Sequence, residues 1–329
     1  MPSPAPAPAP ILVLDRVSKR FAGHTAVDDL SLAVPPGVIY GLLGPNGAGK
    51  TTTIRMAMDI LQPDGGAVRL FGNGASRLHS ARVGYLPEER GLYRKMRVMD
   101  VLVFLGEMKG VERRQAGRRA GEWLDRLGLA QWRLRRIEEL SKGMQQKVQF
   151  ISTVLHDPDL VILDEPFSGL DPVNTQVLKD VVVDLHRRGK TIVFSTHIME
   201  QAEKLCEQIC IIARGRKLVD GALGDIKRTH GGRHLVVEFD GAPGTGAGAA
   251  SQLFADARLV SKVDNYGQYA ELELAPEADP QEILRTLVAS GARLTKFELQ
   301  GPSLHKIFID LVGPDAGVPA VRSDQGATL

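Results

Sequence analysis

The chain has 329 residues, of which 43% are hydrophobic and 24% are charged. It therefore has enough apolar material for a large globular core, and two domains are the default expectation. The 41 basic and 39 acidic residues nearly cancel, so the net charge gives no indication of a nucleic-acid partner. Two cysteines, Cys206 and Cys210, are too few for a disulfide framework or a four-ligand zinc site and are typical of reduced thiols in a cytosolic protein.

The N-terminal residues 1–10, "MPSPAPAPAP", lack the basic and apolar regions of a signal peptide and are typical of a stiff, unpacked extension. No apolar run reaches the roughly 18 residues that a membrane span requires. We therefore expect a cytosolic protein that can touch a membrane through a partner.

Short apolar runs alternate with helical patterns over residues 11–229. The runs at 38–43, 159–165 and 191–196 are bounded by turn or polar residues, as are parallel strands that are buried on both faces. This alternation predicts an α/β domain with a central, mostly parallel sheet.

The helices of this region are predicted by apolar residues spaced three or four apart. Such residues form two faces: Ile54, Met58 and Leu61, and then Met144, Val148, Ile151 and Leu155. Asp171 and Pro172 suit the N-cap and first position of a further helix, which Gly189 can close.

A helical subdomain is predicted at about 93–155, because strand-like runs vanish and Trp123, Leu124 and Leu127 suggest helices. Residues 109–136 hold nine basic and three acidic side chains. Two interpretations stay open for this excess: a solvated helical face, or a surface that docks a partner or lies near anionic lipid.

A second, smaller α+β domain is predicted at 230–312, followed by a loose tail at 313–329. Its strands are expected at 233–240, 260–264, 269–274 and 293–299, with a Gly/Ala loop at 241–250, helices at 252–257 and 280–290, and a hairpin turn at 265–267. The order βαββαβ is that of a ferredoxin-like unit, and a last helix is expected at 303–311.

The stretch "GPNGAGKTT" at 44–52 matches the P-loop pattern and lies between a predicted strand and a predicted helix, which is the context the motif needs. Its glycines let backbone N–H groups approach phosphate oxygens, and the helix N-terminus adds a positive dipole end. Lys50 can reach the β- and γ-phosphates, and the Thr51 hydroxyl can hold Mg²⁺. The phosphate-binding residues predicted here are Gly44, Pro45, Asn46, Gly47, Ala48, Gly49, Lys50, Thr51 and Thr52.

The apolar run at 160–163 ends in two carboxylates, Asp164 and Glu165. A buried strand that ends this way needs a partner for its charges, and a magnesium ion supplies one. We expect Asp164 to orient the metal's water ligands and Glu165 to polarise the attacking water as general base.

Three further stretches make the pattern specific: "LSKGMQQK" at 140–147, "SGLDP" at 168–172 and "STH" at 195–197. With the P-loop and the paired carboxylates, this ordered set resembles the ATP-binding subunit of an ABC transporter over roughly residues 11–227. The resemblance implies a P-loop NTPase fold, ATPase activity, and ATP and Mg²⁺ as ligands.

Site roles follow from the resemblance position by position. Phe21 matches the aromatic residue that stacks on adenine, and Ser141 and Gly143 match the signature residues that reach the γ-phosphate of ATP held by a second subunit. Asp171 matches an interface aspartate, and His197 matches the switch histidine that contacts the γ-phosphate and completes a catalytic set with Lys50 and Glu165.

Two positions depart from the family pattern. The usual Q-loop glutamine is Glu88, which can still hold Mg²⁺ or its water but cannot donate a hydrogen bond when ionised. This puts the usual coupling of that loop to the membrane partner in doubt. The usual LSGGQ signature carries Lys142 and Met144, but Ser141 and Gly143 remain, so we expect hydrolysis to survive.

The resemblance extends to exporter ATPases of the sodium- and drug-efflux type, which have a similar C-terminal domain with a stretch like "PSLHKIF" at 302–308. It implies integral membrane permease subunits and a second copy of the chain as partners, no nucleic acid, and a place on the cytoplasmic face of the cell membrane. A soluble ABC ATPase and the ATPase of an importer remain as alternatives, because catalytic motifs do not report the direction of transport.

Overall fold

A computed structural model of the chain describes residues 8–74, 77–89, 91–230, 234–240, 256–265, 269–301 and 303–312. Contacts divide the chain into two compact units, Met1–Ala222 and Leu223–Leu329. The Gly/Ala loop at 241–250, most of the helix expected at 252–257, most of the turn at 265–267, the tail from 313 and all but the last three residues of the N-terminal extension lie outside the described residues.

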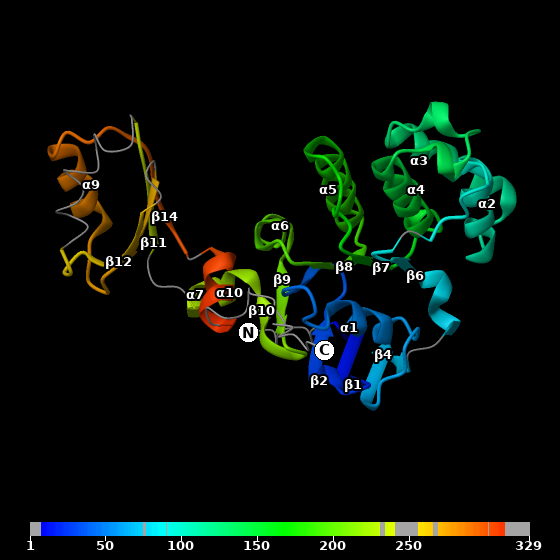
Figure 1. Cartoon of the computed structure of the whole chain (residues 1–329), viewed down its shortest axis with the longest axis horizontal. Helices are drawn as coiled ribbons and strands as arrows, with labels where there is room; N and C mark the ends of the chain where they lie inside the picture. Colours follow the sequence, from blue (N-terminus) through cyan, green and yellow to red (C-terminus); the bar gives the residue numbers. More distant parts are fainter. Residues whose placement is uncertain are drawn as a thin grey trace, which may run out of the picture. The chain divides into compact units, whose positions relative to one another are not determined.

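The first unit is built on a six-stranded sheet in the order β10-β9-β3-β8-β7-β6 (Figure 1). Five neighbouring strands pair in parallel, and only β10 runs antiparallel, beside β9. All residues of β3, β7 and β8 are buried, which confirms the fully apolar strands expected from the sequence. The strands are β3 (Ile39–Leu43), β6 (Val83–Leu86), β7 (Leu160–Asp164), β8 (Thr191–Thr196), β9 (Gln208–Ala213) and β10 (Arg216–Ala222).

A second, antiparallel sheet in the order β2-β1-β4-β5 completes this unit. Helix α1 (Lys50–Ala57) contacts strands of both sheets, and its Ile54 shares one apolar core with Leu14, Leu30 and Leu42. The antiparallel strands are β1 (Leu12–Phe21), β2 (His24–Val34), β4 (Gly65–Leu70) and β5 (Asn73–Gly74).

Three helices of the first unit, α2, α3 and α4, form the region that was expected to be helical. They lie together beyond the β6 edge of the sheet (Figure 1). Besides α1, the first unit contains α2 (Val98–Met108), α3 (Arg113–Arg126), α4 (Lys142–Val154), α5 (Pro172–Arg187) and α6 (Met199–Leu205), with short 3-10 turns at Arg77–Arg82, Ala130–Trp132 and Ile137–Glu139. The class of fold expected from the sequence, α/β with a mostly parallel sheet, is confirmed.

Helix ends show where the sequence signals are strong and where they are weak. Asp171 caps α5 by accepting a hydrogen bond from the backbone N–H of Asn174 at 2.9 Å, and Gly189 follows the helix with a φ of +82°. Helix α1, by contrast, ends at Ala57 because Asp59 adopts a left-handed φ of +55°, so Leu61 lies beyond the helix that it was expected to join.

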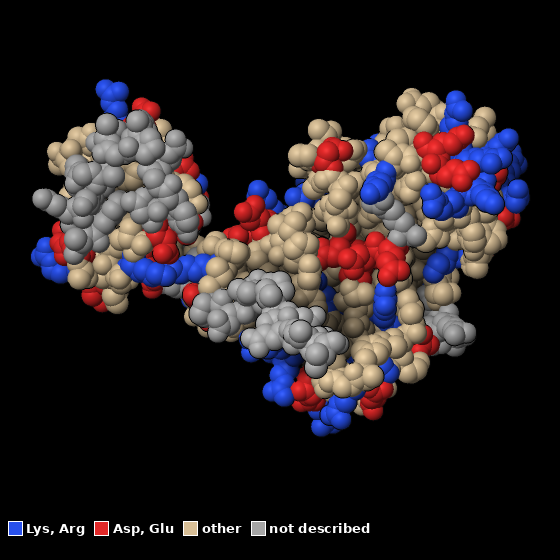
Figure 2. All heavy atoms as spheres, viewed as in Figure 1, with Lys and Arg blue, Asp and Glu red and all other residues tan. Residues whose placement is uncertain are grey.

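The basic stretch 109–136 is mixed with acidic side chains in the structure. Arg113 pairs with Glu107 at 3.0 Å, and Arg126 pairs with Asp184 of α5 at 2.9 Å. Figure 2 shows blue and red side chains side by side on the outside of this helical region. This surface therefore carries its own counter-charges, which favours the solvated-face interpretation.

The second unit contains a four-stranded antiparallel sheet in the order β12-β13-β11-β14. The first strand thus lies between the third and the fourth, which is the order that a ferredoxin-like βαββαβ chain produces. Helix α9 packs Ile283 and Leu287 on the apolar face formed by Leu235, Val237 and Leu272. The elements are α7 (Leu223–His230), β11 (His234–Phe239), β12 (Val260–Asn265), β13 (Tyr269–Leu274), α9 (Pro280–Ala289), β14 (Leu294–Gln300) and α10 (Leu304–Val312).

Helix α7 belongs to the second unit because it packs on α10, whereas the sequence placed the division near residue 230. Cys206 and Cys210 are both buried, and burial raises the pKa of each thiol far above its ordinary value. Within the described part of the chain, no helix has the length and apolar character that a membrane crossing requires.

His156, directly after α4, is a buried titratable group. Its Nε2 lies 3.2 Å from the carbonyl oxygen of Val83 on β6, and its Nδ1 has no hydrogen-bond partner among the described residues. Burial, and then the positive charge of Lys109, lower the pKa of His156 to about 4. The folded chain therefore holds this ring neutral at pH values where an exposed histidine is already protonated.

This histidine makes the folded state sensitive to acid. In the unfolded chain this histidine has a pKa of about 6.5 and binds a proton below that pH, whereas folded His156 does not until about pH 4. The free energy of unfolding therefore falls as the pH drops from about 6.5 to 4. The substitution His156→Gln keeps a donor for the Val83 carbonyl but removes the group that is protonated. As the pH is lowered from about 7 to 4.5, we expect its free energy of unfolding, measured in urea, to fall by about 2 kcal/mol less than that of wild type. The exposed His305→Gln should behave as wild type, and an H156Q curve parallel to wild type would contradict the assignment.

Candidate functional site

The loop between β3 and α1 has a backbone that only glycine adopts readily. Gly44, Gly47 and Gly49 have φ values of +156°, +78° and +103°. A Cβ at Gly44 would lie 2.1 Å from the carbonyl oxygen of Ile212, and one at Gly49 would lie 2.4 Å from that of Ala26. Conformation and close packing therefore explain why glycine stands at both ends of the loop.

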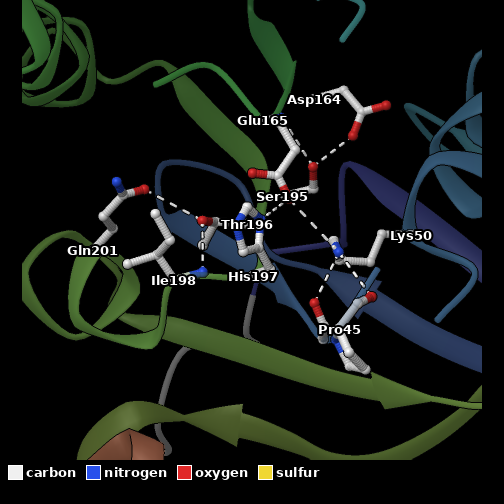
Figure 3. Close-up of polar contacts among 10 residues, drawn as sticks. Pro45, Lys50, Asp164, Glu165, Ser195, Thr196, His197, Ile198 and Gln201 are labelled. Carbon is white, nitrogen blue, oxygen red and sulfur yellow. Dashed lines mark hydrogen bonds and ion pairs between the residues drawn. The ribbon is translucent and has the colours of Figure 1, made fainter. Parts of the chain in front are cut away.

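Lys50, the first residue of α1, has its ammonium group at the centre of this loop (Figure 3). The side chain is only 6% exposed, and its Nζ donates hydrogen bonds to the carbonyl oxygens of Gly44 at 2.8 Å and Pro45 at 3.1 Å. Nζ also lies 3.6 Å from Oε1 of Glu165. Burial lowers the pKa of Lys50, and the carboxylates of Glu165 and Asp164 oppose that shift.

The start of α1 is an open anion-binding end. Gly49 is the N-cap and supplies no side-chain hydrogen bond, and the first turn contains no acidic residue. The N–H groups of this turn thus have no capping side chain, and the helix dipole adds partial positive charge at the same place. A phosphate group suits this end of the helix.

A pocket of about 390 Å³ opens on this loop, a volume within the usual range for small-ligand sites. It brings together residues from distant parts of the sequence, including Phe21, Glu88 and Glu165. Phe21 is 47% exposed, so its ring is available for stacking. The lining residues are Phe21, His24, Ala26, Asn46, Gly47, Ala48, Gly49, Lys50, Thr51, Thr52, Glu88 and Glu165.

The ends of β7 and β8 supply the acidic side of the site. Glu165 follows β7 with a left-handed φ of +48°, and its Oε1 lies 3.0 Å from Nδ1 of His197. The hydroxyl of Thr196 accepts a hydrogen bond from the backbone N–H of Ile198 at 3.0 Å, which shapes the turn that carries His197. Lys50, Glu165 and His197 therefore form a continuous chain of polar contacts (Figure 3).

Asp164 is fully buried beside this chain. Its Oδ1 accepts a hydrogen bond of 2.5 Å from the Ser195 hydroxyl, which itself accepts from the backbone N–H of Glu165 at 3.0 Å. Burial raises the pKa of Asp164, while the hydroxyls of Ser195 and Thr51 act in the opposite direction. Its Oδ2 is buried and has no hydrogen-bond partner among the described residues.

These oxygens fit a magnesium ion. Thr51 and Asp164 lie together, Glu88 lines the same pocket, and all three offer hard oxygen ligands. The described residues contain no ready-made cluster of three His, Cys, Asp or Glu side chains that could hold a metal alone. Magnesium does not require one, since it usually keeps several waters and binds through one or two protein groups together with substrate phosphates.

The predicted residues Gly44, Pro45, Asp164 and His197 do not line this pocket but take part in the contacts around Lys50, Ser195 and Glu165 described above. The predicted residues Ser141, Gly143 and Asp171 neither line the pocket nor share those contacts. Ser141 caps α4 by accepting a hydrogen bond from the backbone N–H of Met144 at 3.3 Å. A Cβ at Gly143 would lie 3.4 Å from Leu170, so the starts of α4 and α5 are neighbours. Ser141 and Asp171 are exposed there.

Sequence reasoning missed some residues of the site. Ser195 lies in the "STH" stretch, but no function was predicted for it from the sequence. The sequence feature that points to it is a hydroxyl near the end of an apolar strand. His24 and Ala26 line the pocket without any motif, because the antiparallel sheet that brings β2 to the loop left no clear pattern.

A P-loop before a helix, and a buried strand that ends in two carboxylates, define a P-loop nucleoside triphosphatase. Two family models match the chain: ABC transporter at residues 27–168, and the C-terminal domain of DrrA1-3-like ATP-binding proteins at residues 221–312.

Known relatives extend over nearly the whole chain. The ABC transporter ATP-binding protein YhaQ of Bacillus subtilis (strain 168) is 44% identical over 309 residues, 92% of this chain and 99% of the relative. The daunorubicin/doxorubicin resistance ATP-binding protein DrrA of Streptomyces peucetius is 32% identical over 308 residues, 91% of each chain. The chain therefore belongs to the ATP-binding proteins of ABC transporters, a family that hydrolyses ATP to power transport.

Solved structures agree with this assignment. The ATP-binding subunit of an ABC transporter superposes with a TM-score of 0.62 at 31% identity, over 67% of this chain and 92% of that one. A nucleotide-free ATP-binding cassette at 21% identity has a TM-score of 0.59 over 67% of this chain and 94% of that one, and supports the fold.

The Ser195 hydroxyl holds Asp164 and the Glu165 backbone in place, so its removal should leave two buried polar groups without a partner. We expect Ser195→Ala to lose about 1–3 kcal/mol of stability in urea unfolding and to lower the ATPase rate. Ser152→Ala, which loses only a hydroxyl bonded within α4, is the control and should change both far less. Equal effects of the two substitutions would refute the role of Ser195.

Proposed function

We propose that the chain binds Mg-ATP in the pocket around Lys50 and hydrolyses it with water polarised by Glu165. The observation that carries this proposal is the contact chain from Lys50 to Glu165, at 3.6 Å, and from Glu165 to His197, at 3.0 Å, at the edge of that pocket. A cation that can bind phosphate, a base that can accept a proton from water, and the imidazole ring of His197 thus lie in one place.

Each part of the nucleotide has a matching surface. The exposed ring of Phe21 suits adenine, and residues 44–52 with the N-terminus of α1 suit the phosphates. Thr51, Asp164 and Glu88 would hold Mg²⁺, which supplies positive charge to the phosphate oxygens when bound.

The carboxylate of the proposed general base contacts the other two members of the catalytic set. Glu165 faces both Lys50 and His197. An incoming triphosphate competes for the Lys50 ammonium, because its charge is greater than that of one carboxylate. The carboxylate of Glu165 is then free to accept a proton from water, and His197 remains beside it to contact the γ-phosphate.

We propose that a second copy of the chain completes each site. Ser141, Gly143 and Asp171 do not line this chain's own pocket, yet the starts of α4 and α5 place them together on an exposed surface. The N-terminus of α4 is capped only by Ser141 and carries no acidic residue in its first turn, so it suits an anion. ATP held by a partner subunit is the anion that this surface fits.

We infer further that the ATPase drives an exporter through an integral membrane permease. Relatives that share most of this chain's length are named for daunorubicin/doxorubicin resistance in Streptomyces peucetius and linearmycin resistance in Bacillus subtilis (strain 168). Another, at 33% identity, is a Nod factor export ATP-binding protein of Rhizobium sp. (strain N33). These names favour export over import, and the whole-length matches favour a transporter subunit over a soluble ATPase.

The exposed apolar surface of α2 suits the membrane partner. Phe104 and Met108 are 38% and 67% exposed, and Met108 lines a hollow of about 420 Å³ together with Met58 and Leu105. Adjacent exposed apolar side chains around a hollow mark an interaction surface.

The role of Glu165 is tested by Glu165→Gln. The amide keeps the size of the side chain but cannot take a proton, so we expect ATP binding within about threefold of wild type, turnover reduced by about 100-fold or more, and a dimer by light scattering with Mg-ATP. The exposed Glu138→Gln is the matched control. An E165Q variant that hydrolyses ATP at the wild-type rate would show that another group is the base.

The membrane partner is tested by pull-down of tagged Glu165→Gln from membranes in mild detergent with ATP. We expect a polytopic membrane protein to co-elute in a stable ratio, and the addition of Met108→Glu to lower its recovery several-fold while ATP binding is unchanged. Recovery of this chain alone, from the soluble fraction, would favour a soluble ATPase instead.

A further inference from the structure

Two residues of α4 and one residue just beyond its end contact the backbone of β6 and of the loop that carries Glu88. Nε2 of Gln149 donates to the carbonyl oxygen of Glu89 at 3.1 Å. Oγ1 of Thr153 donates to the carbonyl oxygen of Gln149 at 3.0 Å and lies 3.4 Å from the carbonyl oxygen of Tyr85. Nε2 of His156 lies 3.2 Å from that of Val83. We call Gln149, Thr153 and His156 the polar stripe.

The polar stripe is buried. Its three side chains are 4%, 4% and 9% exposed. Between two of its contacts, β6 carries Gly84, where an added Cβ would lie 2.2 Å from the carbonyl oxygen of Thr153. Helix and strand therefore approach each other at backbone distance, and Gln149 and His156 add polar contacts to the loop and the strand.

Gln149 is the member of the polar stripe nearest to Glu88. Its partner, Glu89, is the next residue of the loop, and Glu88 itself lines the nucleotide pocket. The other oxygen of the Gln149 amide, Oε1, is buried without a hydrogen-bond partner among the described residues. A buried acceptor without a partner costs free energy, so burial of this side chain does not by itself stabilise the fold. The favourable polar interaction that Gln149 makes is its hydrogen bond to the loop.

The loop has a weaker contact with the P-loop helix. Arg55 of α1 reaches Oε1 of Glu89 at 4.0 Å, but the Glu89 side chain is 88% exposed and that of Arg55 is 44% exposed. Exposed ion pairs at such distances contribute little, whereas a buried hydrogen bond is costly to break. The Glu88 loop is therefore held more firmly by α4 than by α1.

From these contacts we propose that Gln149 is a positioning residue that makes the Glu88 loop and the signature end of α4 move as one body. Helix α4 is a continuous helix from Lys142 to Val154, so a displacement at Gln149 is carried to Ser141 at its start. A ligand that draws Glu88 toward this chain's own pocket would thereby shift the surface that Ser141 offers to the partner's ATP. This inference rests on the proposed function, in which Glu88 faces Mg-ATP.

Hydrogen–deuterium exchange of the nucleotide-free full chain tests the contact itself. We expect Gln149→Leu to raise exchange at residues 83–89 about fivefold, because the lost hydrogen bond favours local opening. Ser152→Ala, on the same helix but bonded only within it, should leave that exchange unchanged. Gln149→Asn, too short to reach Glu89, provides a second variant with the expected effect of Gln149→Leu. Unchanged exchange at 83–89 in both Gln149 variants would overturn the proposal.

Addition of Mg²⁺ with a non-hydrolysable ATP analogue, at a concentration where light scattering reports monomers, tests the transmission. In wild type we expect slower exchange at 44–52 and also at 141–145, and in Gln149→Leu only at 44–52. Equal protection of 141–145 in wild type and Gln149→Leu would overturn the proposal. If 44–52 is unprotected in every variant, the nucleotide-binding proposal fails instead, and the nucleotide-free experiment still decides the role of Gln149.

Discussion

The buried ammonium of Lys50 is the constraint on which the site depends. A cation that is 6% exposed must find compensating groups within a few ångströms, and here the carbonyls of Gly44 and Pro45 and the carboxylate of Glu165 provide them. The loop must therefore curl around the side chain, which requires glycine at its ends. The end of β7 must also lie beside the loop, so one charge ties three segments of the first unit together.

The balance of charge around Lys50 supports the proposal that a divalent cation takes part in the chemistry. Glu88 and Glu165 line the pocket and Asp164 lies directly behind Glu165, whereas Lys50 is the one lysine or arginine among the pocket's described lining residues. A triphosphate entering alone would add its negative charge to a site where carboxyl groups outnumber the lysine. A magnesium ion bound with the nucleotide would offset this charge. The Thr51 hydroxyl and Oδ2 of Asp164, which has no hydrogen-bond partner among the described residues, would receive the ion or its water.

Local chemistry made part of this structure predictable. The P-loop, the carboxylates that end β7, the Asp171 cap and the alternating strand β13 each depend on neighbours in the sequence. The antiparallel sheet left no clear pattern in the sequence, although β1 and β2 pair as neighbours along the chain. The hydrogen bonds of Ser195 and Gln149 could not be read, because their partners lie 30 and 60 residues away and no short pattern encodes them. At Leu61 a local pattern gave a wrong prediction. Its spacing from Ile54 and Met58 suited helix α1, but Asp59 adopts a left-handed conformation and the helix ends before Leu61.

The separation of Ser141, Gly143 and Asp171 from the pocket has a consequence for regulation in the cell. Under the proposal that a second copy completes each site, the site is assembled only when two chains meet, so a dilute chain with ATP bound would remain nearly idle. Two chains anchored to one membrane partner would face each other at an effective concentration in the millimolar range. The cargo-carrying assembly would then act as the switch for ATP consumption, because it supplies the encounter that free diffusion does not.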